Sequence, residues 1–166
     1  ELQQRYGKRS TLERYHFDIA WSLLTEPTWH LLSHVVHRQQ FQKWIQRLII
    51  ATDMDLHHQI MRKSKQGELA AQLQLAVMLI KCADLSQLIR GKEISEEWIS
   101  RLKKELYLEK AALLNIEGKQ IKEELFLAKF IALQQTFLTE YAIPLYQELG
   151  NLLPAAKNLP RFTSLP

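Results

Sequence analysis

The chain has 166 residues, of which 46% are hydrophobic and 24% charged, and this composition is typical of one globular domain with a single core. Its net charge of +4 is mild and its basic residues alternate with acidic ones, so we expect no nucleic-acid partner. No hydrophobic run approaches the ~20 residues of a membrane span, and a single cysteine, Cys82, excludes a disulfide within the chain. These features predict an intracellular, cytoplasmic protein.

The first half of the chain carries the signals of three helices. Ser10, followed three residues later by Glu13, is a capping box, and Pro27 closes the helix that it starts. Gly67 separates the next two helices. The predicted helices cover about 10–24, 38–63 and 68–83, with a short segment at 29–36.

The second half predicts two more helices and no strand. Ser95 before two glutamates indicates a helix that runs to about Leu114. A last helix over about 120–149 bends or restarts at Pro144 and stops at Gly150. The fold class is therefore all-α, a compact helical bundle over 1–150 with a C-terminal tail over 151–166. Because the chain begins at Glu1 rather than at a methionine, we expect it to be part of a longer protein.

Asp84 follows an unusually hydrophobic stretch. Every side chain from residue 75 to residue 80 is apolar, which predicts a helix in the middle of the bundle. An ionised carboxylate at a buried position costs several kcal/mol unless a cation or metal pairs with it. Asp84 is therefore either a metal ligand or a residue that caps the next element or pairs with an arginine.

Two further groups have spacings that suit a metal. His30, His34 and His37 would share one face of a helix, but no acidic residue lies near them to orient the rings, so we interpret them as solvated surface histidines. Asp53 and His57 stand four residues apart in the predicted helix 38–63. That spacing suits either a shared metal or a structural Asp–His hydrogen bond.

Four motifs follow one another in order along residues 6–150. They are the Tyr6, Ser10, Leu12, Glu13 and His16 pattern, the run Ile49-Ile50-Ala51-Thr52-Asp53-Met54 with His57, the run Lys81-Cys82-Ala83-Asp84-Leu85-Ser86, and the set Gln134, Phe137 and Pro144. Together they resemble the motifs of the class I cyclic-nucleotide phosphodiesterases. This resemblance implies a compact, HD-type helical catalytic domain that hydrolyses the 3′,5′-cyclic phosphate of cAMP, cGMP or both to the 5′-monophosphate.

The resemblance also implies a two-metal site. Asp84 would be a direct ligand of a zinc ion, with magnesium or manganese as the second metal. Glu13 and Thr52 would hold waters on that second metal, and Asp53 would help to position them. The remaining ligands and the histidine that acts as general acid would lie in a preceding part of the same catalytic domain, so we expect no catalytic acid in this chain.

The base of the nucleotide would bind to the last predicted helix. By the resemblance, the amide of Gln134 would hydrogen-bond the purine edge, Phe137 would stack on the base, and Leu102 would clamp its other face. An amide both donates and accepts, so it suits either cAMP or cGMP. The alternative for Gln134 and Phe137 is an ordinary interior position in a helix.

The chain also departs from the family pattern. After Trp98 the family usually continues to a glutamine-glycine-aspartate, where this chain has Glu109-Lys110-Ala111, and the segment 114–121 is shorter than the usual loop. These departures leave open a second interpretation, a catalytically degenerate helical scaffold in a dimer or larger assembly.

Overall fold

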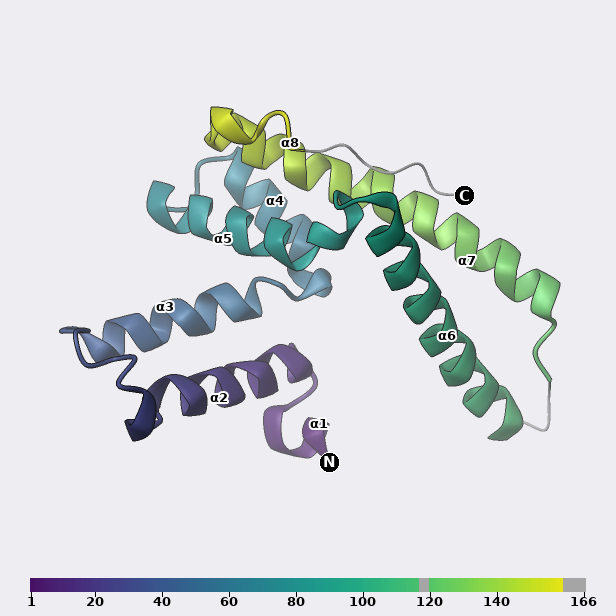
Figure 1. The fold of residues 1–166 in the computed structure, drawn as a ribbon, viewed down its shortest axis with the longest axis horizontal. Coiled ribbons are helices and arrows are strands. Elements are labelled where there is room, and N and C mark those ends of the chain that lie inside the picture. Colours follow the sequence, from purple (N-terminus) through teal and green to yellow (C-terminus); the bar gives the residue numbers. More distant parts are fainter. Residues whose placement is uncertain (117–119, 160–166) are drawn as a thin grey trace. The chain divides into compact units, whose positions relative to one another are not determined.

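The computed structural model describes residues 1–116 and 120–159, and these residues are helical or irregular with no strand among them. The contacts divide the chain into two compact units, Glu1–Lys81 and Cys82–Pro166. Figure 1 shows the helices of each unit. The all-α prediction is confirmed. Within the described part of the chain, no helix is long and hydrophobic enough to cross a membrane.

The first unit contains two helices near the N-terminus that pack against each other, followed by two further helices that are joined by a hydrogen bond. α2 packs on α3, and Gln74 of α5 donates a hydrogen bond of 2.7 Å to the hydroxyl of Ser64 in α4. The elements of this unit are α1 (Leu2–Tyr6), α2 (Thr11–Thr25), η1 (Pro27–Trp29), α3 (Arg38–Ile50), η2 (Met54–Leu56), α4 (His57–Lys65) and most of α5 (Ala71–Asp84).

α2 begins where the sequence predicts, but not by the predicted capping box. Ser10 is the N-cap residue in the left-handed region, with φ of 49°, and its side chain makes no cap hydrogen bond. The hydroxyl instead donates to Asp53, 43 residues further along the chain. The start of the helix is therefore correct and the capping box is wrong, because a tertiary hydrogen bond takes the hydroxyl that the cap would use.

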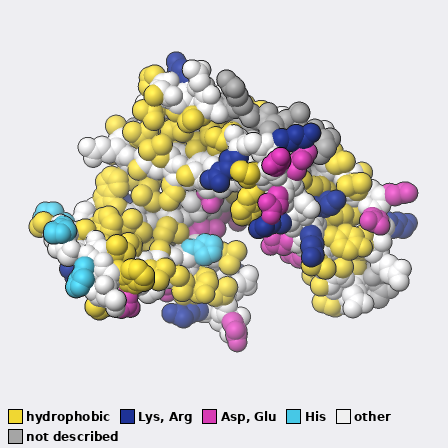
Figure 2. Space-filling model, viewed as in Figure 1, with side chains coloured by type: hydrophobic (Ala, Val, Ile, Leu, Met, Phe, Trp, Pro, Cys, Tyr) yellow, Lys and Arg dark blue, Asp and Glu magenta, His cyan; other side chains and the backbone are white. Residues whose placement is uncertain are grey.

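The hydrophobic residues of α2 occupy two opposite faces. Phe17 is 8% exposed, whereas four residues at helical spacing on the other side are 37–59% exposed. Figure 2 shows hydrophobic side chains at the surface over this part of the chain. A helix that is apolar on both faces is typical of the interior of a larger bundle. The exposed residues are Leu12, Tyr15, Ile19 and Leu23.

The single long helix predicted over 38–63 is wrong. The chain forms α3, leaves the helical conformation at Asp53 (φ −54°, ψ 122°), and begins α4 at His57. Short polar side chains cause this break by bonding to nearby backbone groups. The hydroxyl of Thr52 donates to the carbonyl of Ile49, and the carboxylate of Asp53 accepts from the amide of Asp55. Asp53 and His57 therefore do not share a helical face.

α5 confirms the predicted helix but only part of its predicted burial. Met78 and Val77 are buried, whereas Leu79 is 44% exposed and Asp84 is exposed. The apolar run is thus covered on some faces only. The expectation that Asp84 is a buried carboxylate is wrong.

The second unit is built on a helical hairpin. α6 (Lys92–Ile116) and α7 (Glu123–Phe137) diverge from each other, as Figure 1 shows. Ser95 does not cap α6, which begins three residues earlier; the Ser95 hydroxyl is buried and donates to the carbonyls of Gln87 and Arg90. η3 (Ser86–Leu88) precedes α6.

The predicted restart at Pro144 is confirmed. A π-helical turn, η4 (Leu138–Ala142), separates α7 from α8 (Ile143–Leu152), and Pro144 lies in the first turn of α8, where its missing N–H is tolerated. α8 contributes Leu145, Tyr146 and Leu149 to the core of this unit. The hydroxyl of Tyr146 donates to the carbonyl of Cys82 at 2.8 Å, and burial raises the pKa of Tyr146.

Gly150 does not stop α8, which continues to Leu152. A β-carbon at position 150 would lie 3.2 Å from Cγ of Lys157, just after η5 (Pro154–Ala156). Glycine therefore permits the first part of the tail to fold back on α8. Residues 160–166 of the predicted tail lie outside the described residues.

Candidate functional site

A polar network in the first unit joins the start of α2 to the end of α3. The hydroxyl of Ser10 donates to Oδ2 of Asp53 at 2.6 Å, and Oδ1 of Asp53 accepts from the amide of Asp55 at 2.8 Å. Asp53 is 9% exposed, so its carboxylate needs these partners. Asp53 thus acts as a tie between the start of α2 and the segment that follows α3. Glu13 is half-buried in the first turn of α2.

A buried lysine fixes the same junction from α5. Lys81 is 2% exposed, and its ammonium donates to the carbonyl of Ala51 at 2.8 Å. Thr52 follows directly and is half-buried; its hydroxyl hydrogen is used by Ile49, which leaves the oxygen free to accept a hydrogen bond. The three residues predicted to lie around the second metal, Glu13, Thr52 and Asp53, thus belong to segments that this network holds.

His57 is buried beside this network. It is 1% exposed, and burial, followed by the positive charges of Lys81 and His58, lowers the pKa of His57 from 6.5 to about 4. The imidazole is therefore neutral near pH 7. Because the helix is interrupted between Asp53 and His57, the two residues do not share a helical face, and the predicted Asp–His pair on such a face is wrong.

The network predicts a measurable cost for losing the Ser10 hydroxyl. Ser10→Ala removes a hydrogen bond to an ionised carboxylate, so we expect it to lower the free energy of unfolding by about 1–3 kcal/mol. Urea denaturation followed by circular dichroism measures this change. The matched control is Ser22→Ala, because the exposed Ser22 bonds only to the carbonyl of Ile19 within α2. Equal effects of about 0.5 kcal/mol or less for both variants would contradict the role of Asp53 as a tie.

The low pKa of His57 predicts a pH dependence of stability. Above pH 6.5 the side chain is neutral in both states, and between pH 6.5 and about 4 only the unfolded chain takes up the proton. The free energy of unfolding should therefore fall as the pH falls through this window, by on the order of 1 kcal/mol per pH unit, and His57 should add no further loss below it. Urea denaturation from pH 7 to pH 4.5 tests this. His57→Gln should flatten the slope, whereas His34→Gln, at an exposed site, should not; equal slopes in all three proteins would contradict it.

Asp84 is the last residue of α5 and is exposed. Its carboxylate forms no hydrogen bond or ion pair with another described residue, so neither the predicted cap nor an arginine partner is observed there. A negative charge at the C-terminal end of a helix is opposed by the helix dipole. The fold of the described residues therefore gives no structural reason for an aspartate at this position, and its oxygens are open to a ligand.

Gln134 and Phe137 lie one turn apart near the end of α7. Gln134 is 7% exposed as a whole residue, and its side-chain amide reaches the surface and forms no hydrogen bond with another described residue. Phe137 is half-buried and stacks on Tyr141, with ring centroids 5.5 Å apart and planes 14° apart. Leu102 lies on α6 and is 38% exposed. An amide without an internal partner, next to a supported aromatic ring, suits a planar polar ligand.

The described residues do not contain a complete metal site. No three of their His, Cys, Asp and Glu side chains come together as a donor set. His30, His34 and His37 are exposed, and His30 has a left-handed backbone, so they share no helical face. Asp84 fits a metal site as one donor among others, because it is ionisable, accessible and without a partner in this part of the chain.

Comparison with known proteins identifies the family. Residues 1–162 match the model of the 3′5′-cyclic nucleotide phosphodiesterases. The chain belongs to this phosphodiesterase family. Among its relatives is the human high affinity cGMP-specific 3′,5′-cyclic phosphodiesterase 9A, 27% identical over 176 residues that cover 96% of this chain and 28% of the relative.

Two other phosphodiesterases show the same relation. The Drosophila melanogaster high affinity cGMP-specific 3′,5′-cyclic phosphodiesterase 9A is 30% identical over 171 residues, covering 96% of this chain and 11% of the relative. The Dictyostelium discoideum cGMP-specific 3′,5′-cGMP phosphodiesterase 3 is 29% identical over 172 residues, covering 92% of this chain and 35% of the relative. The chain thus spans about a third or less of the length of these phosphodiesterases.

Proposed function

We propose that this chain forms the C-terminal part of a phosphodiesterase catalytic domain and supplies the base-binding helix and one metal ligand for the hydrolysis of a 3′,5′-cyclic nucleotide. The observation that carries this proposal is the side chain of Gln134, whose amide bonds to no other described residue and is followed one turn later by the ring of Phe137. The three relatives above have names that specify cGMP, which favours cGMP as the substrate.

The base would be held from one helix. Residues three apart in a helix project from the same side, so the amide of Gln134 and the ring of Phe137 can address one bound purine. The ring of Tyr141 supports Phe137 from behind, which keeps the aromatic plane in place. Leu102, exposed on α6, would contact the opposite face of the base.

At the phosphate end, Asp84 would hold one of two divalent metals, zinc with magnesium or manganese. When bound, such a pair lowers the pKa of a water and neutralises charge on the phosphoryl oxygens. Glu13 and the oxygen of Thr52 would orient waters on the second metal. Asp53 would hold the segments of these two residues together through its hydrogen bond with Ser10. Because the described residues offer no complete donor set, the other ligands and the general acid would come from a preceding part of the domain. That preceding part would also cover the exposed hydrophobic face of α2.

Two substitutions in α7 test the base-binding helix. In the complete protein, where these residues are joined to the rest of the catalytic domain, Gln134→Ala and Phe137→Ala should each raise KM for cGMP roughly tenfold or more, because an unpaired polar edge or a lost stack costs about 1–3 kcal/mol. The bound metal should not change, since neither residue lies at the phosphate end. Gln135→Ala, exposed on the same helix, is the control. An unchanged KM in both test variants would contradict the proposal.

The scaffold interpretation remains the competing proposal. Glu109 and Lys110, which stand where the family usually has its glutamine-glycine-aspartate, are exposed on α6. A decayed site would leave the fold intact and abolish turnover. The complete protein would then release no 5′-monophosphate from a cyclic nucleotide, with or without Asp84.

A further inference from the structure

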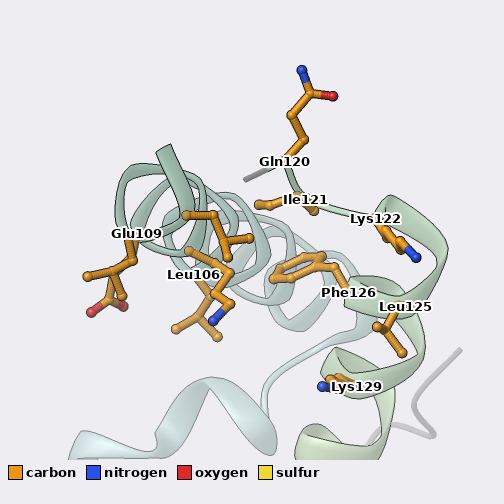
Figure 3. Close-up of a pocket in the computed structure, with 11 residues that line it drawn as sticks. Leu106, Glu109, Gln120, Ile121, Lys122, Leu125, Phe126 and Lys129 are labelled. Carbon is orange, nitrogen blue, oxygen red and sulfur yellow. The ribbon is translucent and has the colours of Figure 1, made fainter. Parts of the chain in front are cut away.

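A hydrophobic groove lies between the diverging ends of α6 and α7. Its volume is about 930 Å³, within the range of ~300–1,000 Å³ that is usual for small-molecule pockets. Figure 3 shows Ile121 and Phe126 reaching into the space beside Leu106. The apolar side chains that line it are Leu106, Leu113, Leu114, Ile121, Leu125 and Phe126.

The aromatic ring of Phe126 fixes the floor of this groove. It meets the edge of Tyr107 from α6 at 5.2 Å, with planes 85° apart, and it stacks on Phe130 at 6.3 Å. The two helices are therefore held together at this level. Leu113 and Leu125 remain 54% and 52% exposed, which leaves an apolar surface open to a ligand.

The rim of the groove is positively charged. Lys110, Lys122 and Lys129 line it, and none of them forms an ion pair with another described residue. Glu109 is the one acidic residue among the lining side chains, and Figure 3 shows its carboxylate pointing away from the space between the helices. Lysine stems extend apolar surface and keep the ammonium groups at the edge. The groove thus combines an apolar floor with a cationic rim.

We propose that this groove binds a free anionic amphiphile, a molecule with an apolar chain or ring body and a carboxylate or phosphate head. The apolar body would cover Leu125, Phe126 and Ile121, and the head would lie among the three lysines. The charge of the head group decides which amphiphile binds. A neutral head would leave the three lysines without an ionic partner, and a cationic head would be repelled by them. This site is separate from Gln134 and Phe137, so it does not depend on the proposed hydrolysis.

The test uses residues 1–166 and three amphiphiles with the same tail, each below its micelle concentration. Dodecanoate carries an anionic head, dodecyl maltoside a neutral one and dodecyltrimethylammonium a cationic one. Isothermal titration calorimetry should show dodecanoate binding about tenfold or more tightly than the cationic compound, and this preference should shrink with added salt. Equal affinity for the two charged compounds, or no binding of dodecanoate, would overturn the proposal.

Two pairs of variants locate the site. Leu125→Glu places a charge on the floor and should weaken dodecanoate binding at least about tenfold. Leu127→Glu is its control, because Leu127 is similarly exposed on α7 but does not line the groove. Lys129→Gln should weaken binding about two- to fivefold, whereas Lys103→Gln, on α6 outside the groove, should not. Equal losses within either pair would overturn the assignment.

Two other occupants would give different results. If the groove holds a second copy of this chain, sedimentation would show a dimer that Leu125→Glu dissociates, with no dodecanoate binding. If it contacts a lipid surface, vesicles containing phosphatidic acid would bind the chain while free dodecanoate would not. Either result would overturn the proposal.

Discussion

Residues 1–166 alone should release no 5′-GMP from cGMP and no 5′-AMP from cAMP, whatever divalent metal is added. The described residues contain no group of three metal-binding side chains, and the one predicted ligand, Asp84, is an exposed carboxylate without an internal partner among them. A single carboxylate cannot hold two metals in the geometry that activates a water. Chromatographic detection of the 5′-monophosphate measures turnover against a metal-only control.

The matched control for this experiment is the Asp84→Asn form of the same residues. If residues 1–166 produced monophosphate above the metal-only control, and Asp84→Asn abolished that production, the chain would hold a complete active site. That result would contradict the proposal that other donors come from a preceding part of the domain.

Asp84→Asn in the complete protein should lower kcat/KM at least a hundredfold. Loss of the residues that merely support a metal ligand costs about 10–100-fold, and loss of the ligand itself should cost more. The fold should not suffer. Removing a negative charge from the C-terminal end of α5 should leave the free energy of unfolding unchanged or raise it by about 0.3–1 kcal/mol.

Loss of activity with unchanged or higher stability distinguishes a metal ligand from a structural aspartate. A structural role would lower stability and activity together. Asp55→Asn, at another exposed carboxylate, should leave kcat/KM within a few-fold of the wild type. If Asp84→Asn retained activity within a few-fold as well, Asp84 would not be a metal ligand, and the proposal that this chain supplies one would be wrong.

The existence and type of the helices follow from local signals in the sequence. Pro27, Gly67 and Pro144 mark real boundaries because proline and glycine act on the backbone directly. Hydrophobic spacing predicts α2 and α5 well. It does not show which face of α2 is covered by other residues, since both faces are apolar and only the tertiary structure buries Phe17.

Three of the wrong predictions share one physical cause, a hydroxyl or carboxylate that bonds to a different partner from the one that the predicted motif assigns. Ser10 has the spacing of a capping residue, but its hydroxyl bonds to Asp53. Ser95 has the acidic neighbours of a cap, but its hydroxyl bonds to carbonyls before α6. Asp53 ends α3 by bonding to the amide of Asp55. Sequence spacing cannot decide between such partners, because a local and a distant hydrogen bond need the same side chain.

Part of the site could have been found from the sequence, and part could not. Lys81 stands out as a charge after an apolar run, and that pattern indicates a buried lysine with a specific acceptor, here the carbonyl of Ala51. The motifs identify Asp84, Gln134 and Phe137 as candidates. No pattern in the sequence predicts that the amide of Gln134 bonds to no other described residue, which is the observation that favours a ligand there.

The most direct measurement is steady-state hydrolysis of cGMP and cAMP by the complete protein that carries these residues, with zinc and magnesium present and the 5′-monophosphate quantified. We predict production of 5′-GMP, with a KM that Gln134→Ala raises roughly tenfold and a rate that Asp84→Asn abolishes. No 5′-monophosphate above the metal-only control, from a protein with its fold intact by circular dichroism, would contradict the proposed phosphodiesterase activity.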